Sequence, residues 1–398
     1  MWQAPVAQQS KSNTQELRGV WMTNVGTALM YYTTRMDEVM AHLAQYRLNT
    51  VYTAVWNQGY TLHPSQVAVR AGSLSRAPLT SLPLLPFQNT LSEAVYQAHR
   101  QHLRLIGWFE YGLMLPVNSP IARKHPDWLT TNSSGGKGNG WLNPFHPTVQ
   151  QFLVDLIVEV VQRYLVDGIQ LDDHFGLPIE FGYDPYTIKL YQADHDGASP
   201  PSNPANPEWI AWRAERLTQL MAKITKAIKA QRPGAIVSLS PHSPNFAYGR
   251  YLQDWVLWVK LGLVDEVIVQ VYRQDLTALK AELYNGGFRS LLRQTVPISI
   301  GLYTGPVLAA KKIHHLRHEV EAVRQAGYKG VSFFCWETTF WLFKGSEDLQ
   351  GEQTFFKLFP KTSDAPDASN PDFSQSLRKK GSKTAKMFIA YEFQQFEA

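Results

Sequence analysis

The chain has 398 residues, with 38 basic and 33 acidic side chains and a net charge of +5. This modest charge, without a basic stripe interleaved with aromatic residues, argues against a nucleic-acid-binding protein. No run of about 18 apolar residues occurs, so the sequence predicts no transmembrane segment. The single cysteine, Cys335, excludes a disulfide within the chain and a cysteine-based metal site.

The ends of the chain are polar. Residues 1–15 lack the apolar core of a signal peptide, and we predict a flexible N-terminal segment there. We expect one domain over residues 16–360 and a mostly mobile, polar tail over 361–398. The compartment stays open: periplasm or cell envelope if a signal peptide was removed, cytoplasm otherwise. The oligomeric state stays open as well.

Between the ends, short apolar segments alternate with segments of helical periodicity. The predicted strands are 17–24, 49–56, 103–110, a fourth that ends at Asp172, 235–241, 266–272, 296–303 and 330–336. The predicted helices are 34–46, 92–102, 147–164, 209–231, 252–261, 276–284 and 313–326. Strand–helix alternation is typical of a parallel sheet, and eight such units predict a closed (β/α)8 TIM barrel.

Long loops follow the second, third and fourth predicted strands, over residues 57–90, 111–146 and 173–207. Such loops are far longer than the usual few residues. All three leave the carboxyl ends of the strands, so we expect them to wall a cleft there. The glycine run at 135–140 follows no strand and opens no helix, which excludes a phosphate-binding loop.

Asp172 ends the fourth strand and is the first candidate for chemistry. Because side chains alternate along a strand, Gln170 and Asp172 are predicted to face the barrel centre, while Ile169 and Leu171 pack under helices. Chemistry in parallel α/β folds lies at the carboxyl ends of the strands. The structural alternative is that Asp172 or Asp173 only caps the next turn.

The same rim gathers polar and aromatic residues from the other strand ends. Aromatic faces stack on sugar rings, and amide or imidazole groups hydrogen-bond to hydroxyls, although each aromatic residue could equally serve ordinary packing. The predicted substrate-binding residues are Asn57, Trp108, His174, His242, Gln270, Tyr272, Tyr303, Trp336 and Glu337.

Four rim carboxylates could act in glycoside hydrolysis, which needs two carboxyl groups that flank the scissile bond. Asp172 is predicted to be the nucleophile or base. Glu110 is the first choice for general acid, because an aromatic setting can raise its pKa by desolvation. A salt bridge from Glu110 to a loop Arg or Lys is the structural alternative. Asp173 and Glu337 are the reserve candidates for the acid.

Several segments, in order along residues 16–340, resemble the glycosyl hydrolase-like 10 family of bacterial, notably cyanobacterial, proteins. Among them are Gly107-Trp-Phe-Glu-Tyr-Gly112, Trp141-Leu-Asn-Pro-Phe-His-Pro147 and Asp167-Gly-Ile-Gln-Leu-Asp-Asp-His174. The resemblance implies a TIM-barrel hydrolase that acts on polysaccharide, for some relatives the bacterial cell-wall glycan.

The segment 167–172 is also similar to the fourth strand of α-amylase-type barrels, whose last aspartate is the nucleophile; this likeness places that role on Asp172. Two departures limit it. Gln170 stands where those enzymes have an arginine, and the fifth strand offers Ser240 and His242 where they have an acidic residue. The general acid is therefore not carried over by this likeness.

Two other hypotheses stay open. The first is a glycan-binding envelope barrel without turnover. The second is a metal-dependent hydrolase in which Asp172, Asp173 and His174 hold a divalent ion. No second histidine falls at ligand spacing, so we place the metal hypothesis below the glycosidase and expect no metal and no cofactor.

Overall fold

The computed structural model describes residues 3–7, 14–32, 35–78, 89–288, 296–306, 310–341 and 358–366. Eight parallel strands close into a barrel in the order β1-β10-β9-β8-β7-β6-β5-β2. These strands are β1 (Leu17–Met22), β2 (Thr50–Ala54), β5 (Arg104–Phe109), β6 (Gly168–Asp172), β7 (Ile236–Ser240), β8 (Glu266–Gln270), β9 (Ile298–Tyr303) and β10 (Gly330–Phe334). The predicted (β/α)8 barrel is confirmed.

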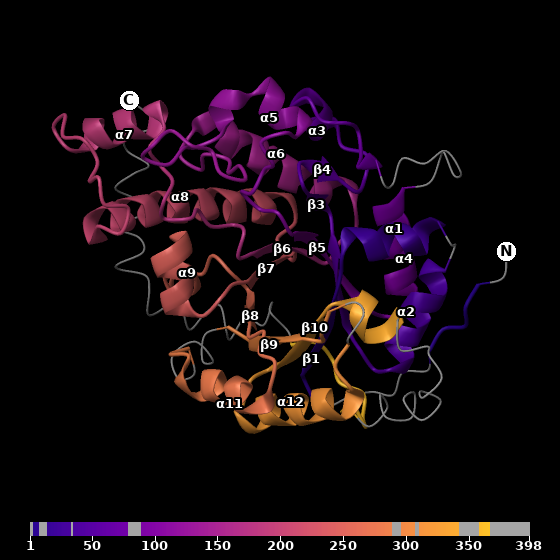
Figure 1. The fold of residues 1–398 in the computed structure, drawn as a ribbon. Helices are drawn as coiled ribbons and strands as arrows, with labels where there is room; N and C mark the ends of the chain where they lie inside the picture. The colour runs from indigo at the N-terminus through magenta and orange to yellow at the C-terminus, as the bar shows by residue number, and fades with distance from the viewer. Residues whose placement is uncertain are drawn as a thin grey trace.

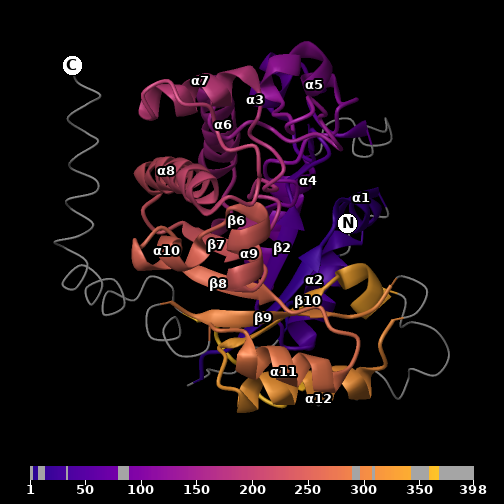
Figure 2. The ribbon, with the colours of Figure 1, turned by 60° about the vertical axis from the view of Figure 1, so that its left-hand side comes forward.

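The helices that correspond to predicted ones surround the barrel. They are α2 (Met36–Gln45), α4 (Thr90–Arg100), α6 (Pro147–Arg163), α8 (Pro207–Gln231), α10 (Trp255–Lys260), α11 (Leu276–Asn285) and α12 (Ile313–Gln325). Helices α6 and α8 lie on one side of the barrel, and α11 and α12 lie on the opposite side (Figures 1 and 2). Within the described residues, no helix combines the length and the hydropathy that a membrane span requires.

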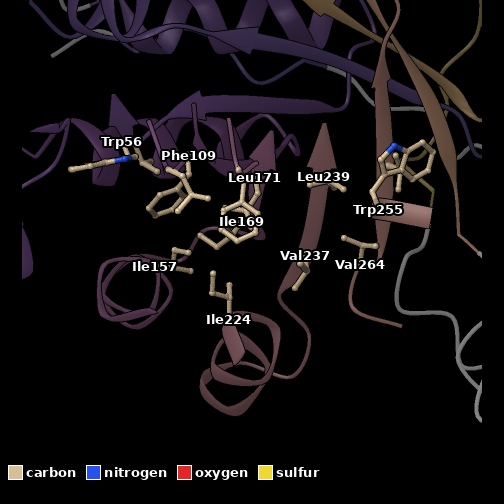
Figure 3. Close-up of a cluster of buried hydrophobic side chains, with 14 of the residues drawn as sticks. Trp56, Phe109, Ile157, Ile169, Leu171, Ile224, Val237, Leu239, Trp255 and Val264 are labelled. Carbon is tan, nitrogen blue, oxygen red and sulfur yellow. The ribbon is translucent and has the colours of Figure 1, made fainter. Parts of the chain in front are cut away.

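The alternation predicted for β6 is confirmed. Ile169 and Leu171 belong to the apolar layer between the strands and the helices, together with Ile157 of α6 and Ile224 of α8 (Figure 3). Gln170 points inward, where it accepts a 2.7 Å hydrogen bond from Trp21 Nε1 and donates a 3.0 Å bond to Ser238 Oγ. The barrel centre therefore carries a satisfied polar layer directly below the end of β6.

Glycine makes room for the large rings inside the barrel. A Cβ atom on Gly301 would lie 3.1 Å from the Trp21 indole, and one on Gly19 would lie 2.9 Å from the Tyr52 ring. At the amino end of the barrel, Glu266 accepts hydrogen bonds from Tyr52 Oη and Arg104 Nη2. Polar and aromatic side chains therefore fill the lower barrel, which favours the carboxyl end as the place for a ligand.

Several short elements within the predicted loops and ends were missed. They are the hairpin β3 (Trp56–Asn57) and β4 (Tyr60–Thr61), the helices α1 (Asn24–Tyr32), α3 (Gln66–Arg70), α5 (Pro120–Lys124), α7 (Pro185–Asp194) and α9 (Pro244–Tyr251), and the turns Pro126–Trp128 and Glu337–Trp341.

The reason is clearest at the prolines. Pro185 belonged to a stretch interpreted as a loop partly because of its prolines, but it stands in the first turn of α7, as Pro244 does in α9, where a missing N–H costs nothing. The predicted helix 252–261 was also wrong at its start. Leu252 adopts a left-handed φ of 58° that ends α9, and α10 begins only at Trp255.

The long loops after β5 and β6 are tied to each other. Asp184, the cap of α7, accepts hydrogen bonds from Thr130 and Asn143 of the loop after β5. An isolated antiparallel β-bridge between Asn132 and Phe181 also joins the two loops. These loops therefore form one rigid wall above the barrel rather than separate flaps.

The two ends of the domain meet at the amino end of the barrel. Glu16 N donates to Asp364 O, and the Ser363 hydroxyl donates to Thr14 O. Ser363 and Asp364 thus pack on the barrel, although we had expected the tail to begin just before them. The domain limits otherwise stay a prediction, because residues 8–13 and 367–398 lie outside the described part of the chain.

Candidate active site

Asp172 ends β6 at the mouth of the barrel, where only 2% of its surface is exposed. Its Oδ2 accepts a 3.0 Å hydrogen bond from Trp108 Nε1, and its Oδ1 accepts a 3.0 Å bond from the His174 backbone N–H. Burial and the neighbouring charge of Asp173 raise the pKa of Asp172 to about 6. The bond to His174 N is the predicted turn cap, so capping and a place in the site coexist.

Asp173 is held differently. Its Oδ1 accepts from Gln270 Nε2 at 2.9 Å, and its Oδ2 lies 3.2 Å from His242 Nε2. Burial alone would raise the pKa of Asp173, but the bond from His242 and the charges of His174 and His242 outweigh burial and lower it. Adjacent carboxyls with pKa values pushed apart are typical of sites that divide acid and base roles.

His174 packs against two aromatic rings. Its ring stacks on Tyr111, at 5.7 Å and 11°, and on Trp141, at 6.1 Å and 24°. Its Nδ1 lies 3.6 Å from Asp172 Oδ1 and 3.8 Å from Asp173 Oδ1, beyond hydrogen-bonding distance. Burial would lower the pKa of His174, but Asp172, Asp173 and Glu110 raise it to about 9. At neutral pH the ring is therefore a fixed cation beside both aspartates.

Glu110 follows β5, the strand that neighbours β6. Its Oε2 accepts a 2.6 Å hydrogen bond from Asn57 Nδ2, and within the described residues it forms no ion pair with an Arg or Lys. Burial, with the charges of Asp172 and Glu337, raises the pKa of Glu110 to about 7. The structural alternative of a loop salt bridge is therefore wrong for the described chain.

Glu337, predicted as a rim carboxylate, ties two parts of the barrel together. Its Oε1 accepts from Thr23 N, Thr23 Oγ1 and Gly26 N at 3.0, 2.6 and 3.0 Å. A Cβ atom on Gly26 would lie only 2.0 Å from that oxygen. With three donors on one oxygen, Glu337 links the end of β10 to the start of α1. The sequence did not predict this link, because the partners lie more than 300 residues apart.

The predicted aromatic residues divide by burial. Trp108 and Trp336 are buried, and Trp108 meets the site through its N–H rather than as an open ring face. Tyr272 stacks on Phe334 at 5.4 Å and lies 6.0 Å from Tyr303, so these rings form the inner lining of the mouth.

Other residues at the site were not predicted. Tyr111 and Trp141 stack on His174, and Gln253 Nε2 donates to the Asp172 carbonyl at 2.8 Å. Tyr111 and Trp141 both stand in segments that carried the family resemblance, which was an available signal for them. Nothing local, however, shows that the Tyr111 ring turns towards β6.

A divalent ion is the remaining chemical option here. One ligand atom each from Asp172, Asp173 and His174 lie within 4.8 Å of one another. Both oxygens of Asp172 already accept from Trp108 and His174, and both oxygens of Asp173 are engaged by Gln270 and His242. Each oxygen keeps a lone pair beside its donor, so these bonds alone do not exclude an ion. The pKa of His174, however, is raised to about 9, so its imidazole is protonated at neutral pH and offers no nitrogen lone pair. The residues present therefore fit a metal poorly.

Comparisons with known proteins bear on most of the barrel. A family model described as glycosyl hydrolase-like 10 matches residues 16–323. The chain is 26% identical over 316 residues to glycosyl hydrolase DigH of Escherichia coli strain K12, covering 66% of this chain and 67% of that protein. A shorter match, 28% identical over 99 residues, is to glycosyl hydrolase YngK of Bacillus subtilis strain 168, covering 23% and 18%.

Solved structures share the fold. The glycoside hydrolase domain of PgaB (BpsB) from Bordetella bronchiseptica has a TM-score of 0.63 at 12% identity, covering 86% of this chain and 98% of that one. The catalytic domain of β-amylase from Paenibacillus polymyxa has a TM-score of 0.55 at 9% identity, covering 87% and 99%. At such identities the likeness shows a common barrel, and the chemistry must be argued from the site.

Proposed function

Since the chain belongs to the glycosyl hydrolase-like 10 family, we propose that it is a glycosidase that cleaves O-glycosidic bonds in a polysaccharide by paired-carboxylate catalysis. One observation carries the proposal: Asp172 and Glu110, from neighbouring strands at the barrel mouth, have pKa values raised to about 6 and about 7. Bacterial cell-wall glycan is the substrate class that the family resemblance implies, and it is the first to test.

The two carboxyls differ in what surrounds them. Asp172 lies beside the His174 cation and accepts two N–H bonds, and both favour its ionised form as nucleophile or base. Glu110 has one amide donor, Asn57, and no cation in hydrogen-bonding contact among the described residues, which favours its protonated form as the acid for the leaving oxygen. Asp173 holds Gln270 and His242 in place at the edge of the site.

The pH profile tests this division of roles. Asp172 must lose its proton, so kcat/KM should rise as pH passes about 6, and Glu110 must keep its proton, so kcat/KM should fall as pH passes about 7. We expect a narrow bell-shaped profile for release of reducing ends from cell-wall glycan. A rate that keeps rising above pH 9 would contradict a protonated Glu110.

A metal-dependent hydrolase is the second candidate, because Asp172, Asp173 and His174 come within ligand distance of one another. We expect glycan cleavage to survive exhaustive dialysis against EDTA, since the proposed chemistry needs only the two carboxyl groups. The measurement is the rate before and after dialysis, with a magnesium or zinc add-back. Loss of the rate with recovery on add-back would favour the metal hydrolase instead.

A glycan-binding barrel without turnover would use the same aromatic mouth. A screen of cell-wall and storage polysaccharides separates the two functions. Retention on a glycan in affinity electrophoresis without release of reducing ends would favour binding alone, whereas release of reducing ends supports the enzyme.

A further inference from the structure

A second aromatic group lies at the mouth, beyond β6 from the cluster of Tyr111, His174 and Trp141. It consists of His242, Phe246 and Tyr251, all from the segment that follows β7, whereas Tyr111 and Trp141 follow β5. Because β6 lies between β5 and β7 in the barrel, the two groups flank Asp172 and Asp173 from either side.

The second group is in contact with Asp173, next to the catalytic Asp172. His242 Nε2 lies 3.2 Å from Asp173 Oδ2, and the His242 ring meets Phe246 edge to face at 5.1 Å and 87°. Tyr251 completes the cluster, with ring centroids 6.0 Å from Phe246 and 6.2 Å from His242. A path of ring contacts therefore runs outward from Asp173 to Phe246.

The backbone that carries this group is fixed. Leu177 N donates to Tyr251 O, and Ile179 N donates to Arg250 O, so α9 is joined to the loop after β6. On the other side of the cluster, Trp255 Nε1 donates to His242 O at 3.0 Å. Phe246 is thus held at a defined place relative to Asp173, as a binding residue requires.

Phe246 nevertheless keeps 47% of its surface exposed. A single exposed hydrophobic residue is ordinary and by itself carries no conclusion. What distinguishes Phe246 is its contact with a histidine that binds a site carboxylate. Phe246 lies near the start of α9, and its contacts with His242 and Tyr251 leave about half of its surface exposed.

We propose that Phe246 is a stacking platform for a sugar of the glycan chain that lies beyond the two sugars at the cleaved bond, on the His242 side of the mouth. This inference rests on the proposed glycan function. An aromatic face offers an apolar surface for the C–H face of a sugar ring, and it tolerates many hydroxyl patterns. The enzyme should therefore favour long chains over short ones.

The test compares wild type and Phe246→Ala on length-graded fragments of cell-wall glycan. We expect the ratio of kcat/KM for an octasaccharide to kcat/KM for a chromogenic disaccharide to fall about tenfold, which equals ~1.4 kcal/mol. Phe246→Trp, which keeps an aromatic face, should restore the ratio. Tyr96→Ala is the matched control, because Tyr96 is 52% exposed on the outer helix α4.

An unchanged ratio in Phe246→Ala, or an equal loss on both substrates, would overturn the inference. Affinity electrophoresis in soluble cell-wall glycan separates this outcome from failure of the proposed function. If the glycan retains the wild type but not Phe246→Ala, and neither protein hydrolyses it, the proposed enzyme activity is refuted and the stacking role of Phe246 is supported. If the wild type and Phe246→Ala hydrolyse the glycan equally well, the activity is supported and the stacking role is refuted. A wild type that neither binds nor cleaves this glycan would overturn both.

Discussion

Asp172→Asn is expected to lower kcat for glycan cleavage by about a thousandfold or more, because an amide neither attacks an anomeric carbon nor takes a proton from water. The fold should survive. The amide oxygen of the variant side chain can still accept from Trp108 Nε1, and the outward Ile169 and Leu171 are untouched. The measurement is single-substrate kinetics on cell-wall glycan, with circular dichroism to show that the variant is folded.

The matched control for this variant is Asp196→Asn. Asp196 is exposed and has a left-handed φ of 51°, a conformation that asparagine also adopts readily. The Asp196→Asn protein should cleave the glycan at the wild-type rate. Full activity in a folded Asp172→Asn protein would refute the role of Asp172 and move attention to Asp173.

Glu110→Gln has the second largest expected effect. Removing the proton donor should lower kcat on a natural glycan by about 10²–10⁴-fold. Glutamine keeps an oxygen for Asn57 Nδ2, so the local hydrogen bond remains. The loss should shrink on an aryl glycoside whose leaving group needs no proton, and the decline in rate above pH about 7 should disappear.

Exposed Glu180, in the loop after β6, gives the control Glu180→Gln, which should leave both kcat and the pH profile unchanged. An identical loss on natural and aryl substrates would argue that Glu110 positions another group and does not donate the proton. Persistence of the alkaline decline in Glu110→Gln would assign that decline to a different residue.

The pKa of Glu110 also fixes the sign of its effect on stability. The folded-state pKa is raised to about 7 from an ordinary 4.5, so the native state holds this proton more tightly than the unfolded state does. Its contribution to stability is therefore present at low pH and is lost as pH rises towards 7. Glu110→Gln should be at least as stable as the wild type at pH 8, which is typical of active-site groups that cost stability.

The two adjacent aspartates at the end of β6 differ in their surroundings. Asp172 is buried, accepts a hydrogen bond from the Trp108 indole and lies next to the charge of Asp173. Asp173, by contrast, has His242 and Gln270 on its two oxygens. Two adjacent aspartates thus acquire pKa shifts of opposite direction. The difference arises from which strand each one faces, because β7 and β8 supply the partners of Asp173.

Local pattern was enough for the architecture. Alternation along β6 gave the inward Gln170 and Asp172 correctly, because opposite faces of a strand are a property of the extended backbone alone. Strand–helix alternation gave the barrel, because parallel strands need a crossover between them. The end of each strand then marks the functional rim, so Glu110, Asp172 and His242 could be placed near one another from residue order.

What the chain order could not supply is the set of contacts made when the barrel closes. The register of β5 against β6 sets Trp108 beside Gln170, from where its indole reaches Asp172. Closure of β10 on β1 brings Glu337 to Thr23 and makes a brace of a residue predicted to bind substrate. These contacts join residues far apart in sequence, and their geometry follows from packing of the whole barrel, which no local periodicity encodes.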